Sequence, residues 1–162
     1  MTDPRRKILS WDAALDWRRA AAQQHHTVVF TNGVFDLLHA GHVDVLWASR
    51  AQGDALVVGI NGDESVRRLN KGPGRPVRSE AERAYVLAAL EAVSAVVIFE
   101  QTTPLDLVRK LEPDVIVKGG DYTPESVVGA AEVRARGGRV VIVPLTPGHS
   151  TTRTIEQLRA SP

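Results

Sequence analysis

Two histidines three residues apart are the first side chains in this sequence whose spacing suggests chemistry. His39 and His42 flank Gly41 at the end of the segment TNGVFDLLHAGH, which begins at Thr31. Side chains at positions i and i+3 lie on the same side of a helical turn, and a helix N-terminus presents unpaired N–H groups to an anion. A glycine also lets a phosphate approach the backbone without a Cβ in the way. The spacing predicts a polyphosphate site in which imidazole N–H groups stabilise charge on a reacting phosphorus.

The histidine pair has two other interpretations. Histidines at this spacing also occur as capping or surface residues, and they occur in zinc sites. A zinc site needs a third ligand, and the neighbouring sequence offers no convincing one. The position of the pair directly after an apolar run, with Asn32 and Gly33 in front of it, favours the phosphate site.

Three further segments carry hydroxyl or cationic groups after apolar runs or between helices. Consecutive hydroxyls at 150–152 suit either a plain helix cap or phosphate binding. The segment KGGDY at 118–122 is typical of a tight turn or of a backbone that contacts a ligand. The loop that contains Lys71 and Arg75 is either a solvated linker or a lid whose cations close over phosphates.

The elements that must position these residues alternate between two hydrophobic periods. Continuous β-branched runs are typical of strands that are covered on both faces. Such runs occur at 28–30, 55–60, 95–99, 115–117 and 140–143. Strands that alternate with helical segments predict a single Rossmann-like α/β domain with a mainly parallel five-stranded sheet and helices on both faces. Ligands in such a sheet bind beyond the carboxyl ends of the strands. The segments that leave the expected strands are 31–42, 61–63, 99–102, 118–122 and 144–152.

Helices are expected from the apolar spacing and from capping residues. Ser79 is a plausible N-cap, and the pair Gly137–Gly138 is a strong stop signal. The expected helices are one beginning after His42 and those at 11–24, 81–92, 104–112, 128–136 and 150–160. We therefore expect residues 1–25 to form an N-terminal helical extension to the main domain at 26–162.

Composition excludes several classes of protein. The chain has 162 residues, enough for one domain with a substantial core, and a formal net charge of +1. That charge argues against a nucleic-acid partner or a membrane surface, because such binding needs a surplus of positive charge. The absence of cysteine excludes disulfides and thiol catalysis. Since no apolar run approaches ~18 residues and the first ten residues do not resemble a secretory signal, we expect a cytoplasmic protein.

The motifs together resemble a known family. The segment TNGVFDLLHAGH is similar to the HxGH signature of the nucleotidyltransferase superfamily, whose cytidylyltransferase-like members pair it with a C-terminal STT motif. From Thr27 to about Leu158 the chain resembles the adenylyltransferases of ADP-heptose synthesis. The motifs that carry this resemblance are GINGDESVRRL, KGPGRPV, ERAYVLAALEAV, PDVIVKGGDYTPE and GHSTT.

The resemblance implies transfer of AMP from ATP to D-glycero-β-D-manno-heptose 1-phosphate with release of pyrophosphate. The sugar phosphate attacks the α-phosphorus directly, and Mg²⁺ is expected on the phosphates without an identifiable protein ligand. Three alternatives remain open: cytidylyl transfer to glycerol 3-phosphate, adenylyl transfer to flavin mononucleotide, and a catalytically silent nucleotide-binding module. Relatives of this kind also imply a homodimer. Trp11 and Trp17 carry apolar surface that suits either a dimer contact or the core of one chain.

The resemblance also implies roles for individual residues. The catalytic candidates are His39, His42 and Lys71. The nucleotide-binding candidates are Thr31, Asn32, Gly33, Phe35, Gly41, Gly119, Asp121, Ser150, Thr151 and Thr152. The substrate-binding candidates are Asp36, Asn61, Asp63, Arg75 and Arg83. For Asp36 the alternative is a structural role, holding a loop through backbone N–H groups, and for Arg83 it is an exposed helix arginine.

Overall fold

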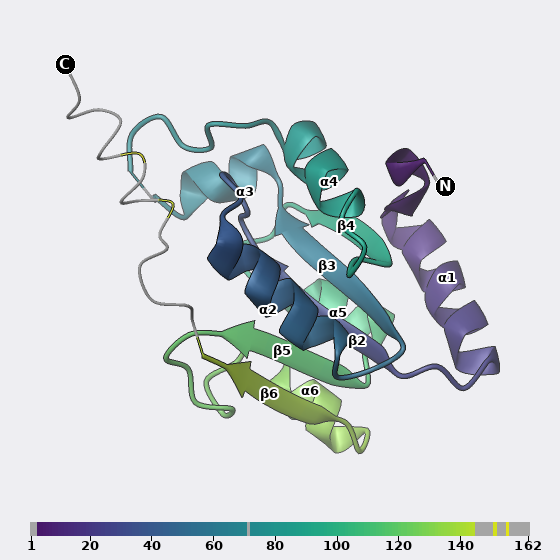
Figure 1. Cartoon of the computed structure of the whole chain (residues 1–162). Coiled ribbons are helices and arrows are strands. Elements are labelled where there is room, and N and C mark those ends of the chain that lie inside the picture. Colours follow the sequence, from purple (N-terminus) through teal and green to yellow (C-terminus); the bar gives the residue numbers. More distant parts are fainter. Residues whose placement is uncertain (1–2, 71, 145–150, 152–154, 156–162) are drawn as a thin grey trace.

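The computed structural model describes residues 3–70, 72–144, 151 and 155, and its centre is a six-stranded sheet (Figure 1). All neighbouring strands are parallel, in the order β1-β4-β3-β2-β5-β6. The strands are β1 (Ile8–Leu9), β2 (Val28–Gly33), β3 (Ala55–Asn61), β4 (Ala95–Phe99), β5 (Val115–Gly119) and β6 (Arg139–Val143). The parallel α/β fold is confirmed, and the sheet has one strand more than the sequence predicted.

The additional strand, β1, is formed by only two residues at the edge of the sheet. Ile8 aligns with Val96 and Leu9 with Val97 of β4. A two-residue apolar pair cannot be distinguished from loop sequence by periodicity, and this is why the pattern missed it.

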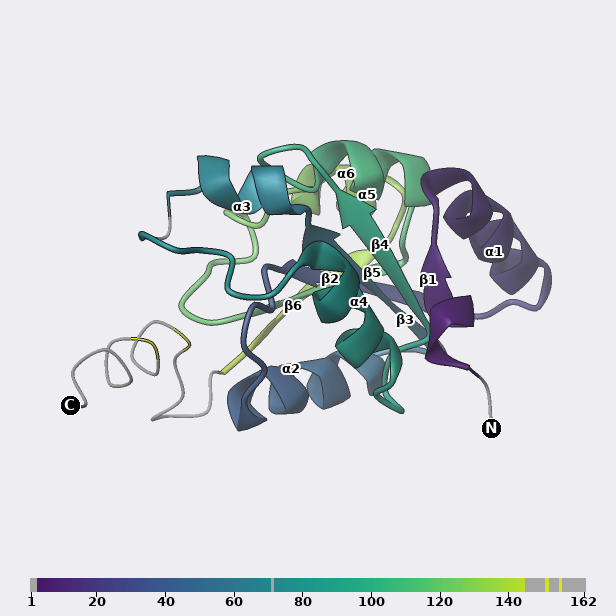
Figure 2. The same cartoon turned by 90° about the horizontal axis from the view of Figure 1, so that it is seen from above.

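Helices cover both faces of the sheet, as the alternating pattern predicted. The helical elements are η1 (Pro4–Lys7), α1 (Trp11–Gln23), α2 (Ala40–Arg50), α3 (Asp63–Arg68), α4 (Glu80–Ala88), α5 (Leu105–Leu111) and α6 (Ala130–Ala135). Helices α2 and α4 lie on one face, and α1, α5 and α6 lie on the other (Figure 2). Within the ranges the structure describes, no helix is both long and apolar enough to cross a membrane.

Each face of the sheet has its own hydrophobic core. Phe30 and Ile116 belong to the core beneath α1, α5 and α6, whereas Val29 and Val115 belong to the core beneath α2 and α4. Successive side chains of a strand point to opposite faces, so strands that are buried on both sides need the continuous apolar runs seen in the sequence.

The two N-terminal tryptophans pack within one chain. Trp11 and Trp17 are partly buried against the core of the α1, α5 and α6 face, and Trp11 Nε1 donates to the backbone oxygen of Ile98 at 2.9 Å. Of the two interpretations of these residues, core packing is therefore the one observed.

The helix ends follow the capping signals more closely than the apolar spacing. Helix α4 begins with a complete capping box between Ser79 and Glu82, and it ends earlier than expected. Helix α3 was not expected, since six residues are too few to show a helical period. The expected closing helix lies outside the described residues, except for Thr151 and Ile155.

Candidate active site

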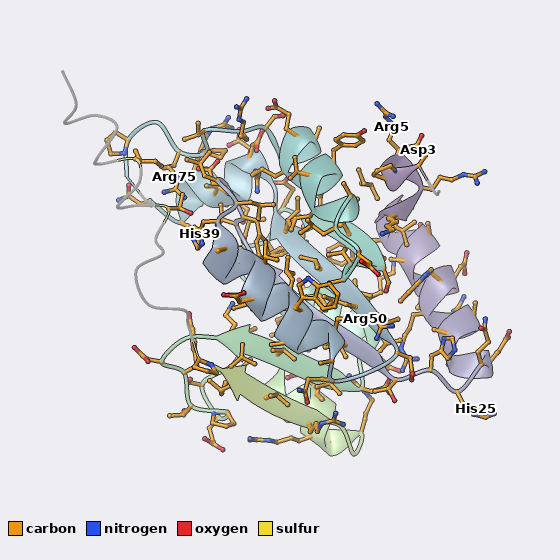
Figure 3. The ribbon with its side chains drawn as sticks, viewed as in Figure 1. Asp3, Arg5, His25, His39, Arg50 and Arg75 are labelled. Carbon is orange, nitrogen blue, oxygen red and sulfur yellow. The ribbon has the colours of Figure 1, made fainter. Side chains whose placement is uncertain are left out.

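The histidine pair lies at the N-terminus of α2, next to the end of β2. His39 is the N-cap residue and His42 lies in the first turn, with its backbone N–H donating to the His39 oxygen at 2.9 Å. The two rings are stacked, with centroids 3.8 Å apart and planes 18° apart. The Phe35 ring lies 5.2 Å from the His42 ring. The shared face predicted from the spacing is therefore present, and Figure 3 shows His39 where the chain enters α2.

Burial controls the charge of His42. Desolvation, and secondarily the adjacent His39 ring, lowers the pKa of His42 from 6.5 to about 4. The imidazole is therefore neutral at pH 7, with one nitrogen donating and the other accepting. Its Nδ1 is buried and has no hydrogen-bond partner among the described residues. A neutral imidazole keeps one N–H, so His42 can still donate a hydrogen bond to a phosphate oxygen.

The lowered pKa predicts how stability depends on pH. The unfolded chain binds a proton at His42 near pH 6.5 and the folded chain only near pH 4, so protons favour unfolding between these values. We expect the melting temperature to fall as pH decreases from 7 to 5, and to fall less in His42→Gln. Thermal unfolding of both proteins across this range tests it. If the melting temperatures of the wild type and His42→Gln depend on pH in the same way, the lowered pKa of His42 is contradicted.

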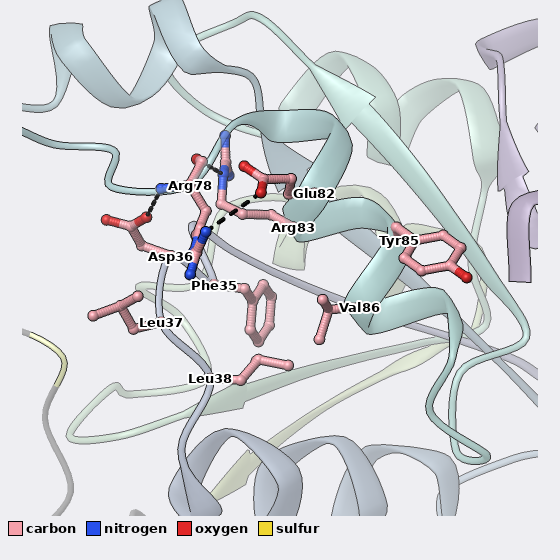
Figure 4. A pocket seen from close by; sticks show the side chains of 9 residues that line it. All are labelled: Phe35, Asp36, Leu37, Leu38, Arg78, Glu82, Arg83, Tyr85 and Val86. Atoms are coloured by element: carbon pink, nitrogen blue, oxygen red, sulfur yellow. Dashed lines mark hydrogen bonds and ion pairs between the residues drawn. The ribbon is translucent and has the colours of Figure 1, made fainter.

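Asp36, in the loop between β2 and α2, holds the 72–78 loop. Its side chain is buried, and the carboxylate accepts hydrogen bonds from the backbone N–H groups of Val77 at 2.8 Å and Arg78 at 3.0 Å. The Arg75 Nε lies 2.5 Å from the same carboxylate, with the arginine side chain only 7% exposed. Figure 4 shows the contact between Asp36 and Arg78. The structural alternative for Asp36 is therefore observed, and Arg75, expected as a lid cation, faces Asp36 in this structure.

Weakening this anchor is expected to expose the 72–78 loop. In Asp36→Asn the carboxylate charge opposite Arg75 is lost and an amide group replaces one acceptor oxygen. We expect trypsin to cut the Arg78–Ser79 bond several-fold faster than in the wild type, as followed by mass spectrometry of the fragments. Asp16→Asn, which alters an exposed carboxylate paired with Arg19, serves as the control. Equal cleavage rates in Asp36→Asn and wild type would show that Asp36 does not restrain the loop.

Arg83 of α4 is buried and joins the ends of two strands, so its interpretation as an exposed helix arginine is wrong. Its Nη1 donates to the backbone oxygens of Val34 at 2.7 Å and Asn61 at 2.8 Å, and its Nε to that of Arg78 at 3.1 Å. Its Nη2 donates to the Asp63 carboxylate at 2.7 Å. The residue is 2% exposed. Arg83 therefore fixes the loop that leads to the histidines relative to β3 and α3.

The other candidates at the end of β3 belong to the same hydrogen-bond network. The Asn61 side chain is buried and donates through Nδ2 to Ser65 Oγ at 3.0 Å, and that hydroxyl donates to the Gln101 backbone oxygen at 2.8 Å. The backbone N–H of Asp63 donates to Glu80 Oε2 at 2.7 Å. Both substrate candidates therefore have partners within the chain and lie beside Arg83.

Several nucleotide candidates gather at the carboxyl ends of β2 and β5. Thr31, Asn32 and Gly33 end β2, and Gly119 ends β5, while the exposed Asp121 follows in the next loop. Parallel strands bring these ends to one edge of the sheet. Gly41 is buried in the first turn of α2, beside the histidines.

The C-terminal hydroxyl motif meets the histidine loop at one described residue. Thr151 Oγ1 donates to the Leu37 backbone oxygen at 3.1 Å, two residues before His39. Segments 114 positions apart in the sequence therefore converge. The remaining candidates Lys71, Ser150 and Thr152 lie outside the described residues.

One side chain near these strand ends was given no role in the sequence analysis, although its segment at 118–122 was a candidate. Lys118, on β5, places its Nζ 3.2 Å from both the backbone oxygen and the Oδ1 of Asn32. The available signal was a lysine between a buried strand and a glycine pair, which is weak without knowledge of strand order.

A cavity of about 390 Å³ lies between the loop after β2 and helix α4 (Figure 4). Its lining is mostly apolar and includes Phe35, Leu38, Tyr85 and Val86, while neither histidine lines it. This cavity therefore adjoins the histidine loop but is distinct from the phosphate site that the histidines predict.

Comparison with known proteins places this site in a family. The cytidylyltransferase-like family matches residues 30–157. The chain is 55% identical over 155 residues to the bifunctional protein HldE of Acidiphilium cryptum, covering 96% of this chain and 32% of that protein. It is 58% identical over 152 residues to HldE of Syntrophotalea carbinolica, covering 94% of this chain and 31% of that protein. The chain thus spans about a third of the length of these curated relatives.

Two solved structures resemble the fold. The lipopolysaccharide core biosynthesis protein of Thermoplasma volcanium has a TM-score of 0.60 and 28% identity, covering 75% of this chain and 97% of that chain. The pantoate-β-alanine ligase of Francisella tularensis, complexed with β-γ ATP and β-alanine, has a TM-score of 0.67 and 13% identity, covering 92% and 72%. The second likeness concerns the fold alone. With a family match that spans most of the sequence, the chain belongs to the cytidylyltransferase-like family.

Proposed function

We propose that the protein transfers AMP from ATP to D-glycero-β-D-manno-heptose 1-phosphate and releases pyrophosphate. The observation that carries this proposal is the stacked His39–His42 pair, with a neutral His42, at the N-terminus of α2 beside the ends of β2 and β5. Donor groups at this place suit a phosphate chain. The identity of 55–58% to proteins named HldE supports the sugar-phosphate branch of the family.

The reaction needs positioning and charge stabilisation more than proton transfer. An oxygen of the sugar phosphate, already anionic at neutral pH, attacks the α-phosphorus of ATP. The bond from that phosphorus to the bridging oxygen breaks, and the electron pair leaves with pyrophosphate. The N–H groups of His39 and His42 stabilise the charge that develops on the phosphate oxygens.

The other candidates divide between the two substrates by their position. We place the nucleotide along the ends of β2 and β5 and against the hydroxyls near Thr151, with Phe35 beside His42. We place the sugar phosphate near the end of β3, where Asn61 and Asp63 lie. Lys71, Arg75 and the hydroxyls of Ser150 and Thr152 remain predicted phosphate ligands.

In this proposal the Mg²⁺ ion is bound by the phosphates of ATP. The described residues contain no group of three or more histidine, aspartate or glutamate side chains arranged to hold a metal ion. Hard oxygen ligands suit Mg²⁺, and the phosphates of ATP provide them. We therefore treat the nucleotide substrate as the MgATP complex.

A nucleotide and acceptor matrix tests the proposal. The purified protein is incubated with MgATP or MgCTP and with heptose 1-phosphate, glycerol 3-phosphate or flavin mononucleotide, and pyrophosphate release is measured. We expect release with ATP and heptose 1-phosphate. Release only with CTP and glycerol 3-phosphate, only with flavin mononucleotide, or with none of the pairs would overturn the proposal in favour of one of the alternatives.

We also propose that the protein forms a homodimer and acts in the cytoplasm, where ATP is supplied. Three exposed apolar side chains support a dimer contact on the face of α2 and α4: Trp47, Tyr85 and Val86. Trp47 alone is 53% exposed. Analytical ultracentrifugation at micromolar concentration should give twice the 17.6 kDa mass of the chain. A monomer mass would contradict the dimer.

A further inference from the structure

Strands β2 and β5 separate at their carboxyl ends. Strand β2 pairs with β3 from Val28 to Gly33, but it pairs with β5 only at Val29 and Phe30. Strand β5 remains paired with β6 as far as Gly119. The strand pairing therefore stops between β2 and β5, which are neighbours in the middle of the sheet (Figure 1). We call this place, beyond Phe30 and Ile116, the opening between β2 and β5. This is where the strand order reverses direction, and ligands of open parallel sheets bind at such a point.

Lys118 spans this opening from the β5 side. Its Nζ lies 3.2 Å from the Asn32 backbone oxygen and 3.2 Å from Asn32 Oδ1. The same Nζ lies 5.6 Å from the ring centroid of Tyr122, in the loop after β5. An ammonium group donates three hydrogen bonds and accepts none, so only the amide oxygen of Asn32 can face it. The Asn32 amide nitrogen, a donor, is therefore turned away from Lys118.

Lys118 places its ammonium group against the two oxygens of Asn32, at the end of β2. His42, at the start of α2, is neutral at pH 7. A triphosphate bound at the ends of β2 and β5 would meet the positive charge of Lys118.

We propose that Lys118 is a positioning residue for the nucleotide: it orients the Asn32 amide and supplies positive charge in the opening between β2 and β5. The inference rests on the proposed nucleotidyltransferase function. Hydrogen bonds of a charged donor are stronger than neutral ones, so loss of the ammonium group should weaken ATP binding about tenfold. The KM for ATP should rise by a similar factor, while kcat changes less, because the interaction forms on binding.

Calorimetric titration with MgATP, without any acceptor, tests the inference directly. Lys118→Met should raise the Kd for ATP about tenfold, and Lys118→Arg should recover part of the loss. The matched control is Lys110→Met, which removes a lysine of α5 that pairs with the exposed Asp12 of α1. Lys118→Met binding ATP within twofold of the wild type would overturn the inference.

A double-mutant cycle separates positioning from an independent effect. Asn32→Ala and Lys118→Met are each compared with the combined variant. If Lys118 acts through Asn32, the combined loss of ATP affinity should be clearly smaller than the product of the two single losses. Losses that simply multiply would overturn the positioning role. Melting temperatures close to that of the wild type verify that the variants are folded.

The same experiment distinguishes failure of this inference from failure of the proposed function. A wild-type protein that binds MgATP but releases no pyrophosphate would overturn the proposed function, and the titrations would still decide the role of Lys118. A wild-type protein that binds neither MgATP nor MgCTP would overturn both. Preference for MgCTP would overturn adenylyl specificity, and the same variants titrated with MgCTP would then test Lys118.

Discussion

Replacing His42 with alanine is expected to slow AMP transfer on the order of 100-fold or more. The imidazole N–H is already oriented by the stack with His39, 3.8 Å away, and stays neutral at pH 7 because burial lowers its pKa to about 4. The charge on the phosphate oxygens changes during the displacement, so a donor at this place stabilises the transition state more than bound ATP. We therefore expect kcat to fall far more than the affinity for ATP changes.

Steady-state kinetics with heptose 1-phosphate and MgATP measure this effect, and His26→Ala is the matched control. His26 is exposed and lies just before β2, at the opposite end of that strand from the histidine pair. Because the stacked rings act as a unit, the double variant of His39 and His42 should lose much less than the product of the single losses. A His42→Ala enzyme with kcat within a few-fold of the wild type would remove the central assumption of the mechanism.

The pH profile gives a second readout for the same residue. The profile of kcat/KM reports groups of the free enzyme. A neutral His42 that acts as a hydrogen-bond donor predicts no loss of kcat/KM from its deprotonation as pH rises from 6 to 8. A decline in this range that disappears in His42→Gln would mean that the imidazolium is the active form.

The sheet was largely predictable because its inner strands are buried on both faces. Val28 to Phe30 and Val115 to Val117 appear in the sequence as short apolar runs, and both form strands at the centre of the sheet. Strand β1 was not predictable in the same way, since two residues at an edge carry no period. Helix α3 was missed for a similar reason, because it is only six residues long.

The site was predictable only where the chemistry is local. His39 and His42 are three residues apart, so one helical turn is enough to bring them together. The partners of Asp36, Arg83 and Lys118 lie 41, 49 and 86 positions away, at Val77, Val34 and Asn32. Which of these side chains meet depends on strand order and loop paths, and a single sequence contains no direct signal for either.

Arg83→Ala is expected to lower the free energy of unfolding by about 3 kcal/mol or more. The guanidinium donates to the backbone carbonyls of Val34, Asn61 and Arg78 and to the Asp63 carboxylate. Truncation leaves these acceptors without their donor in a region where Arg83 is only 2% exposed. For a domain of this size, the loss corresponds to a melting temperature about 6–12 °C lower, measurable by thermal and urea unfolding.

Two control variants show whether Arg83 stabilises the fold or binds the substrate phosphate. Arg78→Ala removes an exposed pair between Arg78, just before α4, and Glu82 of that helix, and such pairs contribute less than about 1 kcal/mol. Arg83→Lys retains the charge but cannot span four separate acceptors, so it should recover little stability. If Arg83→Ala is no less stable than Arg78→Ala and instead raises the KM for heptose 1-phosphate, Arg83 binds the substrate phosphate as the family resemblance implied. If Arg83→Ala loses stability and Arg83→Lys does not restore it, the main role of Arg83 is to hold the histidine loop against the end of β3.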